Sequence, residues 1–190
     1  MKLSRAFYAR DTRIVAQELL GKILVHKTKK GILKGKIVET EAYLGKKDPG
    51  AIGLRKVKNI PKSLLKPAGH AFVYFTYGNH WMFNVLGKKN LLGAVLLRAL
   101  EPLEGIEIMK KRRNTLDIIN LTNGPGKLTQ AFSIDKGHDG QDMTKGYLFI
   151  EHPKKSKKFK IAKTTRIGLS KGENLLLRYY IKDNPFVSKK

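Results

Sequence analysis

The 190-residue sequence contains no cysteine and few acidic residues. The lack of cysteine excludes disulfide bonds, thiolate catalysis, and zinc or iron–sulfur centres that depend on cysteine ligands. Only 15 Asp and Glu residues stand against 39 Lys and Arg residues, which gives a formal net charge of +24. An excess of this size attracts polyanions over long distances and predicts salt-dependent binding to nucleic acid.

The sequence also lacks long hydrophobic runs. No stretch is apolar enough to span a bilayer, and residues 1–5 do not begin the apolar core of a signal peptide. An anionic membrane surface is the rival partner for so basic a chain, but no long basic amphipathic helix is evident. We therefore expect an intracellular protein, in cytoplasm, nucleoid or nucleus, that does not bind membranes.

The composition, with 41% hydrophobic and 28% charged residues, is that of a globular protein, and the chain is long enough for a substantial core. Patterns of helix and strand are mixed along it without repeats. Helices are predicted at 11–20, from Pro102 to about Arg113, and at 127–133. Strands are predicted at 23–26, 35–43, 71–77, 80–86, 94–100, 166–169 and 175–181. Residues 44–70 form a long Gly- and Pro-rich loop, often a functional element, and the lysine-rich residues 154–163 a solvated loop or an exposed strand edge.

Residues 38–43, Val-Glu-Thr-Glu-Ala-Tyr, place acids among apolar and aromatic residues. Alternation along a strand puts Glu39, Glu41 and Tyr43 on one face. A carboxylate beside an aromatic side chain indicates chemistry on the polyanion rather than binding alone. The alternative is a half-exposed strand with two solvated glutamates, because buried carboxylates are rare.

Arg98 interrupts the apolar run of residues 94–100. A guanidinium in a buried strand needs an anionic partner, because an unpaired buried charge is costly. Glu41 is a candidate for that partner. The alternatives are that Arg98 reaches solvent at a strand end or pairs with Glu101.

Residues 72–81 are rich in aromatic side chains and contain Gly78-Asn79, which predicts a two-residue hairpin turn. Tyr77 then stands at the hairpin tip. There it can wedge between bases, or fold back on the sheet. Tyr74 lies on the opposite face of the strand, where it can line an interior pocket.

Other motifs are less informative. The segment Gly124–Lys127 resembles a phosphate-binding loop, but Leu121 and Leu128 break the P-loop pattern. An anion-binding helix N-terminus and a plain helix cap both remain open. The five histidines show no metal-ligand spacing, and no Ser/His/Asp arrangement is legible.

A resemblance to a known family extends over nearly the whole chain, in order. It is carried by residues 38–45, 73–78, 84–85, 96–102, 124–128, 166–168 and 184–188, and near the start by Ala16, Leu19, Leu20 and Gly21. These segments closely resemble the alkyladenine (3-methyladenine) DNA glycosylase family. The resemblance implies an α+β fold: one compact domain, residues 1–190, with a curved, mainly antiparallel sheet flanked by helices and a protruding β-hairpin.

The same resemblance implies a monofunctional enzyme of base excision repair. It would bind double-stranded DNA as a monomer, flip out an alkylated or deaminated purine, and use neither cofactor nor metal. Glu41 matches the general base that activates water for attack at C1′. Arg98 matches the residue that positions carboxylate and water, and the main chain of Ile167 is a further water ligand. Glu39, two residues from Glu41, is expected to have only a modest electrostatic effect.

The resemblance also assigns the residues that hold the flipped base. Tyr43 and Tyr74 match the aromatic pocket walls, and Asn84 matches the floor residue that resists the exocyclic amine of guanine. Tyr77 matches the intercalating tyrosine.

One position departs from the family pattern, because Ile52 stands where a pocket histidine is typical. The main-chain N–H of Ile52 can still donate to the base, but the histidine's stacking and side-chain hydrogen bonds are lost. We expect weaker activity on neutral hypoxanthine and ethenoadenine than on cationic 3-methyladenine and 7-methylguanine.

Two rival classes account for parts of the sequence. A non-catalytic nucleic-acid-binding protein explains the charge, but it gives no role to Glu41 and Arg98. The other class is a catalytically decayed or RNA-directed relative of the glycosylases.

Overall fold

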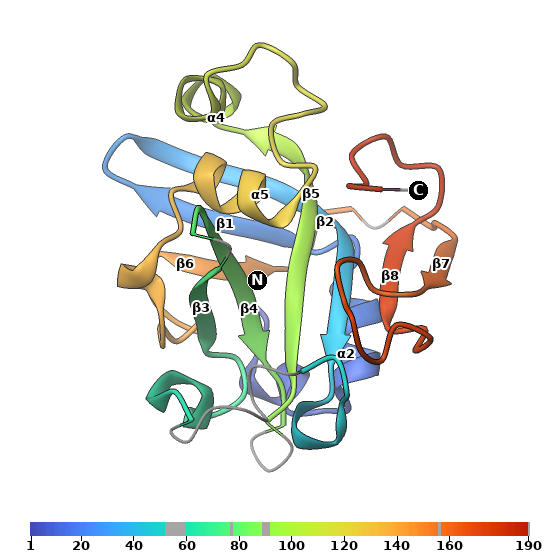
Figure 1. Cartoon of the computed structure of the whole chain (residues 1–190). Helices are drawn as coiled ribbons and strands as arrows, with labels where there is room; N and C mark the ends of the chain where they lie inside the picture. Colours follow the sequence, from blue (N-terminus) through green and yellow to red (C-terminus); the bar gives the residue numbers. More distant parts are fainter. Residues whose placement is uncertain (52–59, 77, 89–91, 156, 190) are drawn as a thin grey trace.

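The computed structural model describes residues 1–51, 60–76, 78–88, 92–155 and 157–189. A curled antiparallel sheet forms its centre (Figure 1), with strand order β3-β4-β5-β2-β1-β6 and with β7 and β8 joined to it through β2. The strands are β1 (Ile23–Thr28), β2 (Gly31–Tyr43), β3 (Ala71–Thr76), β4 (His80–Leu86), β5 (Ala94–Glu104), β6 (Leu148–Glu151), β7 (Ile161–Thr164) and β8 (Arg178–Ile181). The helices are α1 (Arg5–Tyr8), α2 (Thr12–Glu18), α4 (Ile106–Arg113) and α5 (Pro125–Phe132), with short 3₁₀ turns η1 (Gly45–Lys47), η2 (Lys62–Leu65) and η4 (Lys136–His138). The predicted α+β class with a curved antiparallel sheet is confirmed.

Strands β2 and β5 are the longest and lie side by side in the middle of the sheet. Their pairing is regular from Thr40 to Tyr43, and it shifts register between Ile37 and Thr40. Such irregularities bend a strand and redirect its side chains. Arg98 of β5 lies in the shifted stretch, between Leu97, which pairs with Thr40, and Ala99, which pairs with Glu39.

Helices cover both faces of this central pair (Figure 1). On one face, the hydroxyl of Thr40 donates to the carbonyl of Ala16 in α2 (2.8 Å). On the other face, Gly35 lies so close to Leu100 and Phe132 of α5 that a Cβ would approach both side chains within 3.2 Å. Glycine therefore lets α5 pack directly on β2.

Several sequence-based predictions are confirmed. Helix α2 begins after Asp11, whose side chain accepts the N–H of Arg13 (2.8 Å), and the chain turns at Gly21 with φ of 79°. The apolar run at 94–100 is a buried strand, and residues 71–76 and 80–86 form an antiparallel hairpin. The last pair of the hairpin is Thr76 with His80, so three residues connect its strands, not two.

The predicted start of a helix at Pro102 is wrong. Pro102 does not start a helix but pairs with Gly35 inside β5, and α4 begins only after Gly105. β4 pairs only with the first residues of β5, so β5 has a single described neighbour at Pro102, and a missing N–H is tolerated there. Within α4, the ammonium of Lys110 pairs with Glu107 (2.8 Å).

Residues 166–169 are also not a strand. The edge strand is β7, within the lysine-rich segment, and β8 begins at Arg178 rather than 175. Arg166 turns inward instead of pairing in a ladder, and it is buried. In the ranges that the structure describes, no helix is long and apolar enough to cross a membrane.

Candidate active site

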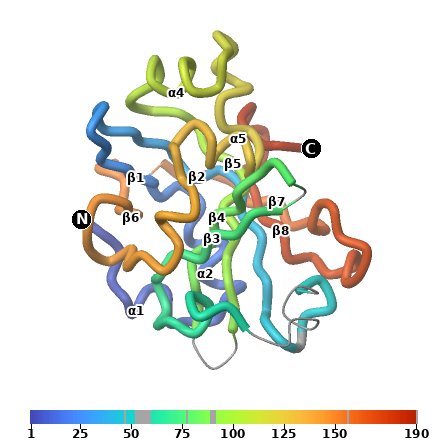
Figure 2. Tube along the Cα trace, turned by 60° about the vertical axis from the view of Figure 1, so that its left-hand side comes forward, coloured from blue at the N-terminus to red at the C-terminus, as the bar shows by residue number. Residues whose placement is uncertain are grey.

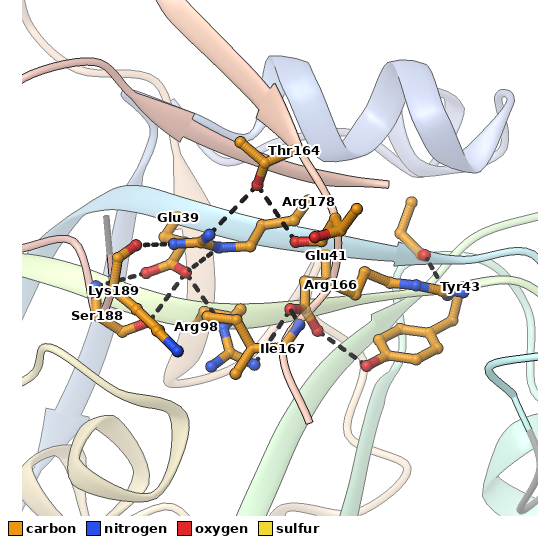
Figure 3. Close-up of polar contacts among 12 residues, drawn as sticks. Glu39, Glu41, Tyr43, Arg98, Thr164, Arg166, Ile167, Arg178, Ser188 and Lys189 are labelled. Carbon is orange, nitrogen blue, oxygen red and sulfur yellow. Dashed lines mark hydrogen bonds and ion pairs between the residues drawn. The ribbon is translucent and has the colours of Figure 1, made fainter. Parts of the chain in front are cut away.

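The carboxylate of Glu41 lies at the centre of the molecule and is wholly buried. Its Oε1 accepts the main-chain N–H of Ile167 (2.9 Å) and pairs with Nη1 of Arg98 (3.2 Å). Its Oε2 accepts the hydroxyl of Tyr43 (2.8 Å), as Figure 3 shows. The alternative of two solvated glutamates is therefore wrong, and the pairing of Arg98 with Glu41 is confirmed.

Glu41 and Tyr43 act as one unit because they are two residues apart on the same face of β2. Burial, with the negative charge of Glu41 added to it, raises the pKa of Tyr43 far above its usual range. The phenol therefore stays protonated and donates to the carboxylate. The guanidinium of Arg166 lies over the Tyr43 ring, 4.7 Å from its centre, and so covers one face of the ring.

A fully buried ion pair holds the loop that presents Ile167. Nη1 and Nη2 of Arg166 bind the two oxygens of Asp48 at 2.5 and 2.7 Å, and Nη1 also donates to the carbonyl of Ala42 (3.0 Å). Burial alone would raise the pKa of Asp48, but hydrogen bonds from Arg166 and from the N–H groups of Leu44 and Gly50 lower it. This pair joins the segments 44–50 and 166–172, which lie side by side in Figure 2.

Glu39 is as buried as Glu41. Its Oε1 pairs with Nε of Arg98 (3.2 Å) and Nε of Arg178 (2.7 Å) and accepts the hydroxyl of Ser188 (2.9 Å). Its Oε2 accepts the N–H of Ser188 (2.7 Å). Arg98 therefore bridges two carboxylates, and neither alternative for it, solvent or Glu101, is correct. Glu101 binds Lys36 instead.

A mostly apolar cavity of about 390 Å³ opens beside this cluster, a size typical of small-molecule sites. It is lined by Tyr43, Gly50, Ala51, Pro61, Leu64, Phe72, Tyr74, Thr76, Asn84, Leu92 and Ala94. Asn84 is buried, and its amide donates to the carbonyl of Phe72 (3.2 Å). The ring of Tyr74 is partly exposed and lies 5.2 Å from that of Phe72.

A second hollow, of about 530 Å³, shares Tyr43 and Tyr74 with the first. Its walls include Arg98 and Ile167, two of the three donors to Glu41, and the segment Gly124–Lys127 at the start of α5. The segment predicted to be an anion-binding helix N-terminus or a plain helix cap therefore lines the second hollow, with Gly124 as the N-cap residue of α5. In the described ranges, no three His, Asp or Glu residues are grouped as metal ligands.

The structure thus brings six of the eight predicted site residues together: Glu41, Arg98, Tyr43, Tyr74, Asn84 and Ile167. Ile52 and Tyr77 lie outside the described residues. Sequence reasoning missed Asp48, Arg166, Arg178 and Ser188. Arg178 offered the same indication as Arg98, a basic residue within a predicted apolar strand, but nothing local indicated its partner.

The family of the chain follows from comparison with known proteins. Residues 6–185 match the family model of methylpurine-DNA glycosylase (MPG). The chain belongs to this family. It is accordingly a DNA glycosylase, a DNA-repair hydrolase that cleaves N-glycosidic bonds in DNA.

Curated relatives agree with this assignment over at least nine tenths of their length. A protein from Prosthecochloris aestuarii is 47% identical over 190 residues, which cover 99% of this chain and 91% of the relative. One from Carboxydothermus hydrogenoformans is 45% identical over 192 residues, with complete coverage of both chains. Both carry the name "Putative 3-methyladenine DNA glycosylase". The predicted family is confirmed, and the rival interpretation as a non-catalytic binding protein is set aside.

Proposed function

We propose that this glycosylase is monofunctional and that its single domain, as a monomer, removes alkylated purines, 3-methyladenine among them, from double-stranded DNA. The observation that carries the proposal is the environment of Glu41. A buried carboxylate is held by Arg98, Tyr43 and Ile167 beside an aromatic cavity. This arrangement suits activation of a water molecule against a sugar whose base occupies the cavity.

The target bond is hidden in a duplex, so the nucleotide must first leave the base stack, at a cost of a few kcal/mol. The lining of the cavity includes the rings of Tyr43 and Tyr74, which can stack on the base, and Asn84, to which we assign the floor. The hairpin that carries Tyr77 borders the same space, because Thr76 lines both hollows and His80 lines the second. We assign the wedge that fills the vacated stack to Tyr77.

A carboxylate accepts about four hydrogen bonds, two at each oxygen. Within the described part of the chain, Oε1 of Glu41 has two partners and Oε2 has one, the Tyr43 hydroxyl. The open position on Oε2 is where a water can donate. Its oxygen then bonds to C1′ as the bond from C1′ to the purine breaks, the electron pair leaves with the base, and Glu41 takes the proton.

The negative charge of Glu41 also stabilises the oxocarbenium character that develops at the sugar. Cationic purines leave as neutral bases and need little assistance, which favours 3-methyladenine and 7-methylguanine. Neutral hypoxanthine and ethenoadenine need donors from the pocket. We expect slower excision of both, because Ile52 replaces the family's histidine. Asn84 would exclude guanine by opposing its exocyclic amine.

Water rather than an enzyme amine is the proposed nucleophile. No lysine is among the described residues that line the cavity of about 390 Å³. Lys127, which lines the second hollow, is bound to Asn120 and Asn123. A Schiff base with the sugar, which would lead to strand cleavage, therefore has no amine in place in that part of the structure.

The test is a duplex with one 7-methylguanine, assayed for free base by chromatography and for strand breaks before and after alkali. We expect base release with breaks only after alkali. Breaks without alkali would contradict the monofunctional mechanism. Release from RNA or single strands alone would contradict the proposed substrate, and binding without release would identify a catalytically decayed relative.

A further inference from the structure

Glu39 is a buried carboxylate to which the proposed reaction assigns no part. It is wholly shielded from solvent and accepts from four donors: the Nε atoms of Arg98 and Arg178, and the N–H and hydroxyl of Ser188. Buried ion pairs seldom add stability over apolar side chains of similar size, because desolvation offsets their attraction. A charge network this deep beside a catalytic site therefore suggests a functional role.

The guanidinium of Arg98 is divided between two carboxylates. Its Nε contacts Oε1 of Glu39 and its Nη1 contacts Oε1 of Glu41, both at 3.2 Å. Arginine and carboxylate commonly form bidentate pairs, in which two N–H groups occupy both oxygens. Glu39 withholds Nε from such a pair, so that Arg98 reaches only Oε1 of Glu41. Oε2 is thereby left to Tyr43 and to the attacking water.

The charges around Glu41 also balance through Glu39. Among the described residues, the Arg178 side chain has Glu39 as its carboxylate partner (2.7 Å), and it also contacts Thr164, the carbonyl of Lys189 and the ring of Tyr180. With Glu39 neutral, Glu41 would be the one charged carboxylate left against Arg98 among the described residues. Arg98 would then be drawn fully onto the catalytic carboxylate.

The segment from Asn184 to Lys189 closes this network from outside. Val187 is buried, Phe186 packs on the core, and Ser188 supplies two of the four donors to Glu39. Figure 3 shows Ser188 and Lys189 on the side of Glu39 that lies away from Tyr43. No residue of the segment is among the described lining of the cavity, yet Ser188 binds the carboxylate that holds Arg98.

We propose that Glu39 is a positioning residue for catalysis: together with Ser188 and Arg178 it holds Arg98 in the orientation that leaves Oε2 of Glu41 open to water. The inference rests on the proposed function and extends it to residues outside the base pocket.

The experiment compares single-turnover excision of 7-methylguanine by the wild type, Glu39→Gln, Arg98→Gln and the double variant. Misplacement of a reacting group by about 1 Å can cost roughly 10²-fold in rate, and we expect a loss of that order for Glu39→Gln. Lesion binding should be unchanged, because the pocket lining is intact. In the Arg98→Gln background, Glu39→Gln should cost almost nothing more, since Glu39 acts through Arg98. Independent, multiplicative losses would overturn the proposal.

A second, milder variant tests whether a loss of rate in Glu39→Gln comes from misfolding. Ser188→Ala removes one donor to Glu39 and leaves the main-chain N–H, so it should lower the rate less than Glu39→Gln, without changing lesion binding. Glu104→Gln is the matched control, because it breaks an exposed ion pair with Lys34 (2.8 Å) in the same sheet. Equal losses in Glu104→Gln and Ser188→Ala would argue against a positioning role.

The two levels of the proposal fail differently. If the wild type releases no base, the proposed function is wrong. If the wild type is active, Glu41→Gln is inactive, and Glu39→Gln and Ser188→Ala retain the full rate, only the positioning role of Glu39 is wrong.

Discussion

The hydroxyl of Tyr43 donates a 2.8 Å hydrogen bond to Oε2 of Glu41, so a wall of the cavity and the candidate general base are joined directly. A base that stacks on Tyr43 is thereby brought into register with the carboxylate. Arg166 extends this unit, because it lies over the same ring and anchors the loop that carries Ile167.

Glu41→Gln keeps the size of the side chain and removes the base and the negative charge. Loss of a general base costs about 10²–10⁴-fold, and loss of the anion beside an oxocarbenium-like sugar adds to that. Single-turnover excision should collapse, while lesion binding measured by electrophoretic shift is retained. An active Glu41→Gln enzyme would show that another group activates water.

Tyr43→Phe keeps the aromatic wall and deletes the donor to Oε2. A hydrogen bond to a charged group is worth about 1.5–3 kcal/mol, which corresponds to a rate loss of roughly 10- to 100-fold. Binding of the lesion should change little, because stacking remains. If binding falls while the single-turnover rate of the bound complex holds, then Tyr43 serves recognition only.

Asp48→Asn breaks a buried pair by removing one partner and leaves Arg166 uncompensated. Such a change typically costs about 3–5 kcal/mol of folding free energy. Urea unfolding should show the loss, and excision should fall as the loop of Ile167 loosens. Glu18→Gln, which breaks an exposed pair with Arg10, serves as the control and should cost less than about 1 kcal/mol. Similar losses in both variants would contradict this account of the Asp48 pair.

Asp142 gives the protein a specific sensitivity to acid. Burial alone would raise its pKa, but hydrogen bonds from Thr144 and Arg5 lower the pKa of Asp142 from 3.8 to about 2. A lowered carboxyl pKa contributes stability at pH values above the unfolded value, and that stability is lost as pH falls toward the folded value. Wild type and Asp142→Asn should therefore differ in unfolding free energy above about pH 4 and converge near pH 2. A constant difference across that range would disprove the linkage.

Affinity for undamaged duplex should fall steeply between about 50 and 200 mM salt, because lysine and arginine contacts displace condensed counterions. The slope of log affinity against log salt, measured by fluorescence anisotropy, gives the number of phosphates contacted. An affinity that is flat over this range would mean that the net charge of +24 does not form a phosphate-binding surface.

Much of the fold could be predicted from the sequence because the local periodicity of apolar residues indicates which face of a helix or strand is buried. Alternation correctly placed Glu39, Glu41 and Tyr43 on one face of β2, and the apolar run around Arg98 correctly indicated a buried strand. The errors fell where context outside the segment decides the conformation. Pro102 is tolerated in β5 because that end of the strand has one described neighbour, and residues 166–169 leave the sheet because Arg166 binds Asp48.

The sequence by itself determined the class of the fold, the strongly basic character and, through its motifs, the residues around the cavity. Only the tertiary structure decided how the buried charges pair. Arg98 binds two carboxylates at once where the register of β2 and β5 shifts beside it, and such an irregularity redirects side chains in a way that regular alternation along one strand does not predict. Asp48 with Arg166, and Glu39 with Arg178 and Ser188, join segments more than a hundred residues apart. A charged residue in an apolar strand indicates that it needs an oppositely charged partner, but only the packing of the folded chain decides which distant residue that partner is.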